Sequence, residues 1–329
     1  MPIQKLLSVE ASGPLETTRH FLAQVWERSE LDGMFIPAWD AGDDDPRPAL
    51  LTHPADLKRA DPFAPLMVLN TAPHIAALAA DRSHQHLAAV LRPCELRSLR
   101  ELARRQSLDL SSLLLISPDC LATFPHEDFD WRVQHAAFIE RVTDEALHFA
   151  AQGGILPSRL RPACQACDHP YPADADIHIG VLGLETNHSL IIGFRDAALA
   201  QRVGWQEAPA PSADLLARRE RVIEKLAEWR QRSRAYAESH LEEGQATLEG
   251  LVRHLRYCEN CRNWISRACP FFADDWRSTS EGEVMGELES SWLPSCGGCG
   301  MCDHTCPDDY PLSTVIGHLA RRVGSAAAV

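Results

Sequence analysis

The sequence predicts an α/β protein with a mostly parallel sheet core, a helical linker and a small cysteine-rich C-terminal unit. Over the first 210 residues, short apolar segments alternate with helical ones, the pattern of βαβ units. Seven of the 11 cysteines fall after residue 250. A chain of 329 residues that is 45% hydrophobic can form two compact units. We therefore expect a core at 1–210, a linker at 211–250 and a C-terminal unit at 251–329.

The core begins with a helix at 12–31, which Ser12-Gly13-Pro14 opens. Apolar segments then predict four buried strands, at 33–39, 66–70, 87–92 and 112–117. Helical sequence follows at 71–82, at 94–106 and near 130–151. Two further strands, at 177–183 and 189–194, can form a hairpin.

The linker follows "APAPS" at 208–212, where a boundary is expected. Apolar residues then recur at helical spacing, Ser212 can cap the helix, and Gly244 can end it. We expect this charged helix to act as a strut between the two units.

The charge and the absence of long apolar segments exclude some classes of function. A net charge of −14 argues against binding to a nucleic-acid backbone. No apolar segment approaches the roughly 20 residues that span a bilayer, and no signal peptide is evident. We expect a cytoplasmic protein, with docking on a membrane complex as an alternative. Its cysteines are then metal ligands rather than disulfides.

The C-terminal cysteines follow the C-x2-C-x2-C-x3-C-P pattern of half a two-cluster ferredoxin: Cys296, Cys299, Cys302 and Cys306. Three thiolates at this spacing bind one cube of iron and sulfide, and the fourth serves the neighbouring cube. The motif predicts a ferredoxin-like [4Fe–4S] module, with a zinc site as the alternative.

An incomplete half precedes this motif. Cys258, Cys261 and Cys269 keep three positions of the pattern, but Trp264 stands where the third cysteine belongs. By the crossing rule, Cys269 completes the cluster of Cys296, Cys299 and Cys302, and Cys306 joins Cys258 and Cys261. The second cluster then has three iron atoms, a non-cysteine ligand or a cysteine from elsewhere in the fold. Alternatively, only one cluster forms. His254 and Asp303 lie nearby in sequence, but a lone residue of either type is more often a surface residue.

Four cysteines remain in the core. Cys94 opens a helix after a strand, and Cys120 follows the next strand. Both are expected at the carboxyl edge of a parallel sheet, where ligand sites gather. Cys164 and Cys167 form a C-x2-C pair. Spacing alone supports equally a four-ligand site and scattered core cysteines beside a zinc-binding pair.

The segments "LRPCELRSLREL", "ISPDC" and "RPACQACDHPYPADADIHIG" together resemble the beta-subunit family of coenzyme F420-reducing hydrogenases and formate dehydrogenases. The resemblance covers about residues 8–200. It implies that the four core cysteines bind one [4Fe–4S] cluster beside FAD. It also implies flavin contacts from "ASGPLETTRH", where Pro14 replaces a glycine, and from "LNTAPH". The candidate flavin residues are Ser12, Gly13, Thr17, Asn70 and Thr71.

The resemblance implies an electron-transfer flavoprotein subunit with two to three clusters, one of them [3Fe–4S] as an alternative. Its partners would be a catalytic formate dehydrogenase or hydrogenase subunit, other electron-transfer subunits and a soluble hydride or electron carrier. Two other readings stay open: a flavin-free iron–sulfur relay or scaffold, and a zinc-binding interaction module. If all clusters form, we expect about 11 to 12 iron atoms per chain.

Overall fold

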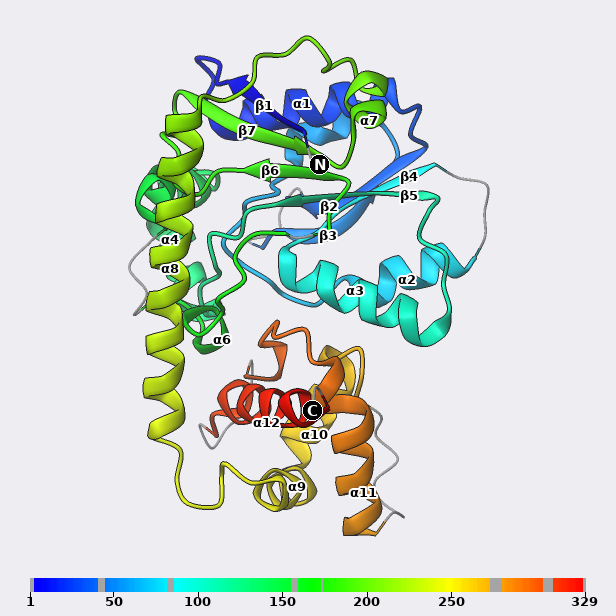
Figure 1. Cartoon of the computed structure of the whole chain (residues 1–329), viewed down its shortest axis with the longest axis vertical. Coiled ribbons are helices and arrows are strands. Elements are labelled where there is room, and N and C mark those ends of the chain that lie inside the picture. The colour runs from blue at the N-terminus through cyan, green and yellow to red at the C-terminus, as the bar shows by residue number, and fades with distance from the viewer. Residues whose placement is uncertain are drawn as a thin grey trace.

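The computed structural model describes residues 3–40, 45–81, 86–154, 159–172, 174–272, 280–303 and 310–327. One seven-stranded sheet lies at the centre of the N-terminal part, in the order β1-β7-β6-β5-β4-β2-β3 (Figure 1). Its strands are β1 (Ile3–Ser8), β2 (Gly33–Ala38), β3 (Arg47–Leu51), β4 (Leu87–Val90), β5 (Leu113–Pro118), β6 (Ile177–Gly180) and β7 (Ser189–Phe194).

The four central strands, β2, β4, β5 and β6, are parallel to one another. The outer pairs are antiparallel: β3 with β2, β7 with β6, and β1 with β7. The predicted α/β class and mostly parallel core are therefore confirmed, and the hairpin of β6 and β7 is present. The edge strands β1 and β3 were not predicted, because their half-exposed residues lack a long apolar run.

Helices cover both faces of the sheet. On one face, α1 (Pro14–Arg28), α5 (Arg141–His148) and α7 (Ala197–Arg202) pack over one hydrophobic cluster. On the other, α2 (Ala72–Ala80) and α3 (Pro93–Gln106) form a second. Alternate residues of β4 serve the two clusters, as the two-residue period of a strand requires: Ala88 and Val90 face the first, Leu87 and Ala89 the second.

Two sequence predictions were wrong. The apolar segment 66–70 is not a strand. Its neighbouring carbonyls bond elsewhere: the Arg92 guanidinium donates to Ala64 and to Leu66 (2.5 Å), and the Phe124 amide donates to Pro65. The expected helix at 130–151 is divided into α4 (His126–His135), α5 and the short η2 (Phe149–Gln152). Both segments are apolar because they are buried, but neither forms the single strand or helix that was predicted for it.

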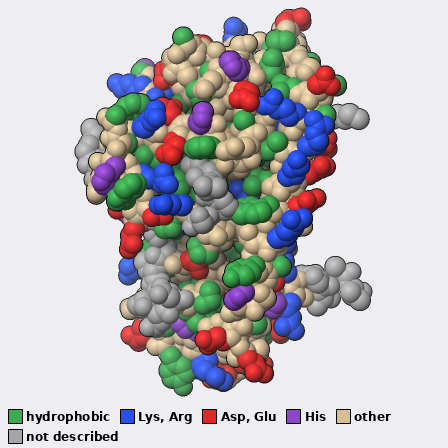
Figure 2. Space-filling model, turned by 90° about the vertical axis from the view of Figure 1, so that its left-hand side faces the viewer, with side chains coloured by type: hydrophobic (Ala, Val, Ile, Leu, Met, Phe, Trp, Pro, Cys, Tyr) green, Lys and Arg blue, Asp and Glu red, His purple; other side chains and the backbone are tan. Residues whose placement is uncertain are grey.

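The predicted linker is the long helix α8 (Ala213–Ser239), which lies along the molecule from the sheet to the C-terminal helices (Figure 1). The Ser212 side chain accepts a hydrogen bond from the Leu215 amide, as expected of a cap. The helix ends at Ser239, before Gly244. Basic and acidic side chains are interspersed over the face of the molecule in Figure 2.

The C-terminal residues form their own hydrophobic cluster, with members from Leu248 to Leu319. It is built by α9 (Leu248–Tyr257), α10 (Glu259–Ala268), α11 (Glu281–Glu287), η5 (Leu288–Trp292), η6 (Leu293–Ser295) and α12 (Leu312–Ala327). Its described elements are all helical, and the structure does not confirm a ferredoxin-like module. The division at 210 and 250 stays a prediction. No helix among the described residues is long and apolar enough to cross a membrane.

Candidate metal centres

The carboxyl edge of the parallel strands carries the first cysteine group. Cys94 lies in the first turn of α3, after β4, and Cys120 follows β5. A Glu95 carboxylate oxygen accepts a hydrogen bond from the Arg92 amide (3.0 Å), which closes the start of α3. The Cys120 amide donates to the Pro170 carbonyl (2.6 Å) and so ties this edge to the loop after the C-x2-C pair.

That loop supplies Cys164 and Cys167 through the short helix α6 (Pro162–Gln165). Cys94, Cys120, Cys164 and Cys167 all line one small pocket, so the structure brings the predicted four together. Burial raises the pKa of Cys120 to about 11, and the nearby Cys164 adds to the rise. For Cys164 itself, burial is outweighed by the Arg161 guanidinium and by Thr123 Oγ1, 3.3 Å from Sγ, which lower its pKa.

The second group lies in the C-terminal part. Cys269 follows α10, and Cys296, Cys299 and Cys302 come from the loop before α12. Burial raises the pKa of Cys296 to about 12, with Cys269 as the next cause. Burial likewise raises the pKa of Cys269 to about 11, with Cys299 next. Burial also raises the pKa of Cys302, and the other three thiols contribute, so the four lie close enough to interact. That they bind one cluster stays a prediction. Cys306 lies outside the described residues.

The two groups adjoin at Cys299. This residue lines the same pocket as the four core cysteines. The buried Arg161 lies between them: its guanidinium donates to the Cys299 carbonyl and to Met301 Sδ (3.3 Å). Burial would lower the pKa of Arg161, but Cys164, Cys299 and Cys94 raise it. The side chain of one arginine therefore faces both groups.

Two glycines allow the C-terminal loop to approach the core so closely. A Cβ on Gly297 would overlap Ser98 Oγ of α3, and one on Gly300 would overlap Ala163 Cβ of α6. Gly300 also has a positive φ of 67°, which favours glycine. The Arg97 guanidinium donates to the Gly297 carbonyl (3.0 Å).

Helix α8 contacts both parts of the molecule through charged side chains. Near its start, Arg219 donates to the buried Asp119 from Nη1 (2.6 Å) and Nη2 (3.0 Å). Burial alone would raise the pKa of Asp119, but Arg219 and then His178 hold it below its usual range. Further along, Arg230 Nη1 donates to the Cys167 carbonyl (3.0 Å).

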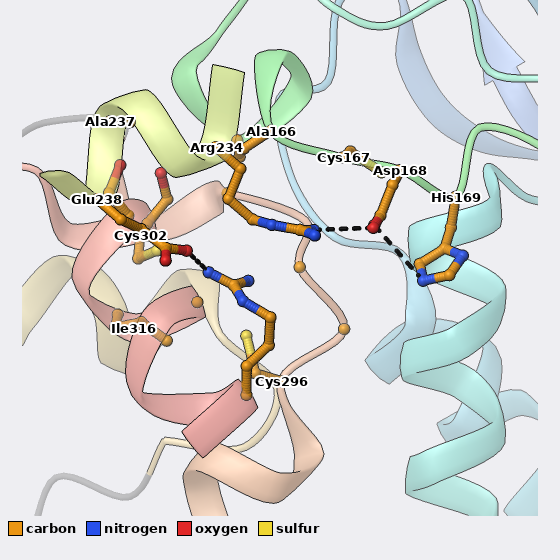
Figure 3. A pocket seen from close by; sticks show the side chains of 18 of the residues that line it. Ala166, Cys167, Asp168, His169, Arg234, Ala237, Glu238, Cys296, Cys302 and Ile316 are labelled. Carbon is orange, nitrogen blue, oxygen red and sulfur yellow. Dashed lines mark hydrogen bonds and ion pairs between the residues drawn. The ribbon is translucent and has the colours of Figure 1, made fainter. Parts of the chain in front are cut away.

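A cavity of about 270 Å³ lies where α8, α12 and the two cysteine loops meet (Figure 3). Cys167, Cys296 and Cys302 line it. Ion pairs flank it: Arg234 pairs with Asp168 (2.9 Å) on the core side, and Arg321 of α12 pairs with Glu238 of α8 (Figure 3).

Trp264 stands at the third ligand position of the incomplete half, and its indole Nε1 donates to the Met301 carbonyl (2.7 Å). Trp264, Cys94 and Cys299 all pack against one small cluster formed by Met67, Ala268 and Met301. The Asp303 carboxylate accepts hydrogen bonds from Ser313 at the start of α12 and, after burial, is the next cause of the raised pKa of Cys302. His254 Nε2 lies 3.3 Å from Cys261 Sγ. Sequence reasoning named His254 but had no means of placing it, because the contact depends on how α9 and α10 meet.

The candidate flavin residues fall at two places. Ser12 and Gly13 precede α1, whose first residue is Pro14. Thr17 Oγ1 is buried and bonds to the Gly13 carbonyl (2.8 Å) and to the Glu10 amide. Asn70 Nδ2 donates to Ser98 Oγ (3.1 Å), and Thr71 Oγ1 donates to Glu95 (2.7 Å). The side chains of Thr17, Asn70 and Thr71 thus bond within the fold.

No family model matches the chain. The F420-dependent formate dehydrogenase subunit beta of Methanocaldococcus jannaschii is 22% identical over 289 residues, which cover 76% of this chain and 73% of that protein. A chain in the xenon-derivatised F420-reducing [NiFe] hydrogenase complex of Methanosarcina barkeri gives a TM-score of 0.49 at 14% identity. That match covers 74% of this chain and 93% of the other, but its TM-score is too low to carry an argument.

The formate dehydrogenase subunit matches about three quarters of this chain. The cysteines of this chain gather at the carboxyl edge of its sheet and in the loop before α12. The chain is therefore similar to an F420-dependent formate dehydrogenase subunit beta, in line with the beta-subunit family that its core cysteine motifs resemble.

Proposed function

We propose that this chain is an iron–sulfur electron-transfer subunit of a formate dehydrogenase or hydrogenase complex. The observation that carries the proposal is the pair of adjoining cysteine groups, one at the sheet edge and one beside α12, which share Arg161 and Cys299 at their border. When bound, [4Fe–4S] clusters supply one-electron transfer. The relative named above is a formate dehydrogenase subunit, which supports the choice of complex.

The thiols present fit one cluster in each group. In the core group, Cys94, Cys120, Cys164 and Cys167 would be the ligands. Cys94 lies at the start of α3, where backbone N–H groups favour a thiolate. A cluster with four thiolates carries negative charge, and a buried charge needs a counter-charge. Arg92 and Arg230 supply it at Cys120, whose pKa both side chains lower against burial and the neighbouring thiols.

In the C-terminal group, Cys269, Cys296, Cys299 and Cys302 would be the ligands. The Trp292 indole donates to Cys269 Sγ (3.2 Å). Hydrogen bonds to ligand sulfur are one means by which a protein sets the potential of a cluster. The buried Arg161 faces both groups, and the half-buried Trp264 packs, like Cys94 and Cys299, against the cluster of Met67, Ala268 and Met301. With a cluster bound in each group, the chain would hold two adjoining electron carriers with Arg161 at their border.

FAD is the further cofactor that the family resemblance implies, with a soluble hydride carrier as its partner. The residues that would hold it do not fit this role as they stand. Thr17, Asn70 and Thr71 use their polar side-chain atoms within the fold, and Pro14 removes one N–H donor from the start of α1. These observations favour a second candidate function, a flavin-free iron–sulfur relay that joins two redox partners.

Anaerobic purification tests both candidates. We expect at least about eight iron atoms per chain, four for each group, and an EPR signal of reduced clusters after dithionite is added. A count reproducibly below about four would overturn the proposed function. Acid extraction decides between the candidates, because released FAD identifies the flavoprotein and its absence from brown, iron-replete protein identifies the relay.

A further inference from the structure

The incomplete cysteine half forms a compact set of ligand atoms. His254, Cys258 and Cys261 each offer one atom, and these three atoms all lie within 4.8 Å of one another. The Cys258 and Cys261 sulfurs are 3.2 Å apart, and His254 Nε2 is 3.3 Å from Cys261 Sγ. Among the residues that the structure describes, no other set containing a cysteine has three candidate ligand atoms at this spacing.

These separations of 3.2 and 3.3 Å lie a few tenths of an ångström below those around one tetrahedral metal ion. With Zn–S near 2.3 Å and Zn–N near 2.0–2.1 Å, neighbouring ligand atoms around zinc stand about 3.5 to 3.8 Å apart. Thiolates on a [4Fe–4S] cube stand farther apart, because each binds a different corner of the cube. The core group and the group of Cys269, Cys296, Cys299 and Cys302 lack the compact spacing, which separates them from the set at His254.

The local fold orients these ligands. His254 lies in the last turn of α9, Cys258 occupies the junction between α9 and α10, and Cys261 lies in the first turn of α10. The start of a helix stabilises the thiolate that a metal requires. The His254 ring stacks on Tyr310, with centroids 3.8 Å apart and planes at 14°, so its orientation is fixed. Cys261 is only 2% exposed.

We propose that His254, Cys258 and Cys261 bind one zinc ion, where ferredoxin spacing would place a second C-terminal cluster. The donor set of two thiolates and one imidazole is typical of zinc. The three ligands leave the fourth position of the tetrahedron to another donor. The ion fastens α9 to α10 and so stabilises the small C-terminal cluster of helices. This proposal does not depend on the clusters of the proposed function.

Metal analysis of the full chain, purified without oxygen, tests the proposal. We expect about one zinc and about eight iron atoms per chain, instead of the 11 to 12 irons of three clusters. Protein produced with Co²⁺ in place of zinc should show thiolate-to-cobalt absorption and the d–d bands of a tetrahedral ion. About 12 irons without zinc, or no cobalt bands, would overturn the proposal.

Substitutions of the proposed ligands test whether the zinc ion binds at this site. His254→Ala should lower the zinc retained against a chelator at least about tenfold. His240→Ala is the matched control, because the His240 ring also packs against a tyrosine, Tyr236 (centroids 4.1 Å apart, planes tilted by 40°), at the end of a helix, and this variant should retain its zinc. His254→Cys replaces the imidazole with a thiolate and should restore zinc if the alanine variant folds poorly. Unchanged zinc in H254A would refute the site, whereas absent iron with normal zinc would refute only the proposed function.

Discussion

The approach of the C-terminal loop to the core depends on Gly300, and a single methyl group should disturb it. In Gly300→Ala the new Cβ would overlap Ala163 Cβ, far inside the about 3.5 Å at which two carbon atoms attract. Neither atom ends a flexible side chain, so the backbone of the loop or of α6 must move. That movement would separate Cys299 from the core cysteines.

The neighbouring Gly298 provides a matched control. Its φ is 68° against 67° for Gly300, so alanine is equally strained at both positions. A Cβ on Gly298, however, meets only an Arg97 guanidinium nitrogen, at 4.0 Å. Left-handed strain costs about 1–2 kcal/mol, and overpacking adds about 1–3 kcal/mol. We therefore expect Gly298→Ala to lose about 1–2 kcal/mol and Gly300→Ala about 2–5 kcal/mol.

Urea titrations under anaerobic conditions, followed by circular dichroism, measure the two free energies of unfolding. EPR of the fully reduced protein measures the magnetic interaction between the two clusters, which should weaken in Gly300→Ala and persist in Gly298→Ala. Equal stability and equal spectra for the two variants would show that the contact with Ala163 does not hold the loop in place.

Other substitutions test the remaining charges and ligands. Arg219→Leu leaves the Asp119 carboxylate buried without its main partner and should lower the free energy of unfolding by about 3–5 kcal/mol. The control Arg218→Leu breaks an exposed ion pair of the neighbouring α8 residue and should lower it by at most about 1 kcal/mol. Equal losses in urea titrations of the two variants would contradict this expectation. Because the folded protein lowers the pKa of Asp119, its contribution should be complete above about pH 4 and fade as pH falls further, and acid titrations should show a weaker dependence in Arg219→Leu. Cys94→Ser should remove about four iron atoms by metal analysis and leave the C-terminal cluster signal in EPR, and unchanged iron would exclude Cys94 as a ligand.

The sequence predicted those features of the molecule that depend on residues close together in the chain. Strand-to-helix junctions placed Cys94 and Cys120 at one sheet edge, because parallel strands end on the same side. Ser212 marked the start of α8, since a serine side chain can accept from the amide three residues on.

The other features depend on contacts that no local pattern encodes. The segment 66–70 is apolar because it is buried, but it is not a strand. The Leu66 carbonyl accepts a hydrogen bond from the Arg92 guanidinium instead of from a neighbouring strand. Trp264 stands at a ligand position of the cysteine motif, yet its indole donates to the Met301 carbonyl, a long-range contact that the motif does not encode. The approach of His254 to Cys261 likewise depends on how α9 and α10 meet at Cys258.

Helix α8 is attached to the rest of the molecule at three points along its length, so the number of residues between these points is constrained. Arg219 binds the sheet, Arg230 the loop of Cys167, and Glu238 the terminal helix α12. One inserted residue between Arg219 and Arg230 would advance the rest of the helix by about 1.5 Å and rotate it by about 100°. Related sequences should therefore lack insertions and deletions between Arg219 and Glu238, while the solvent-facing residues of α8 vary.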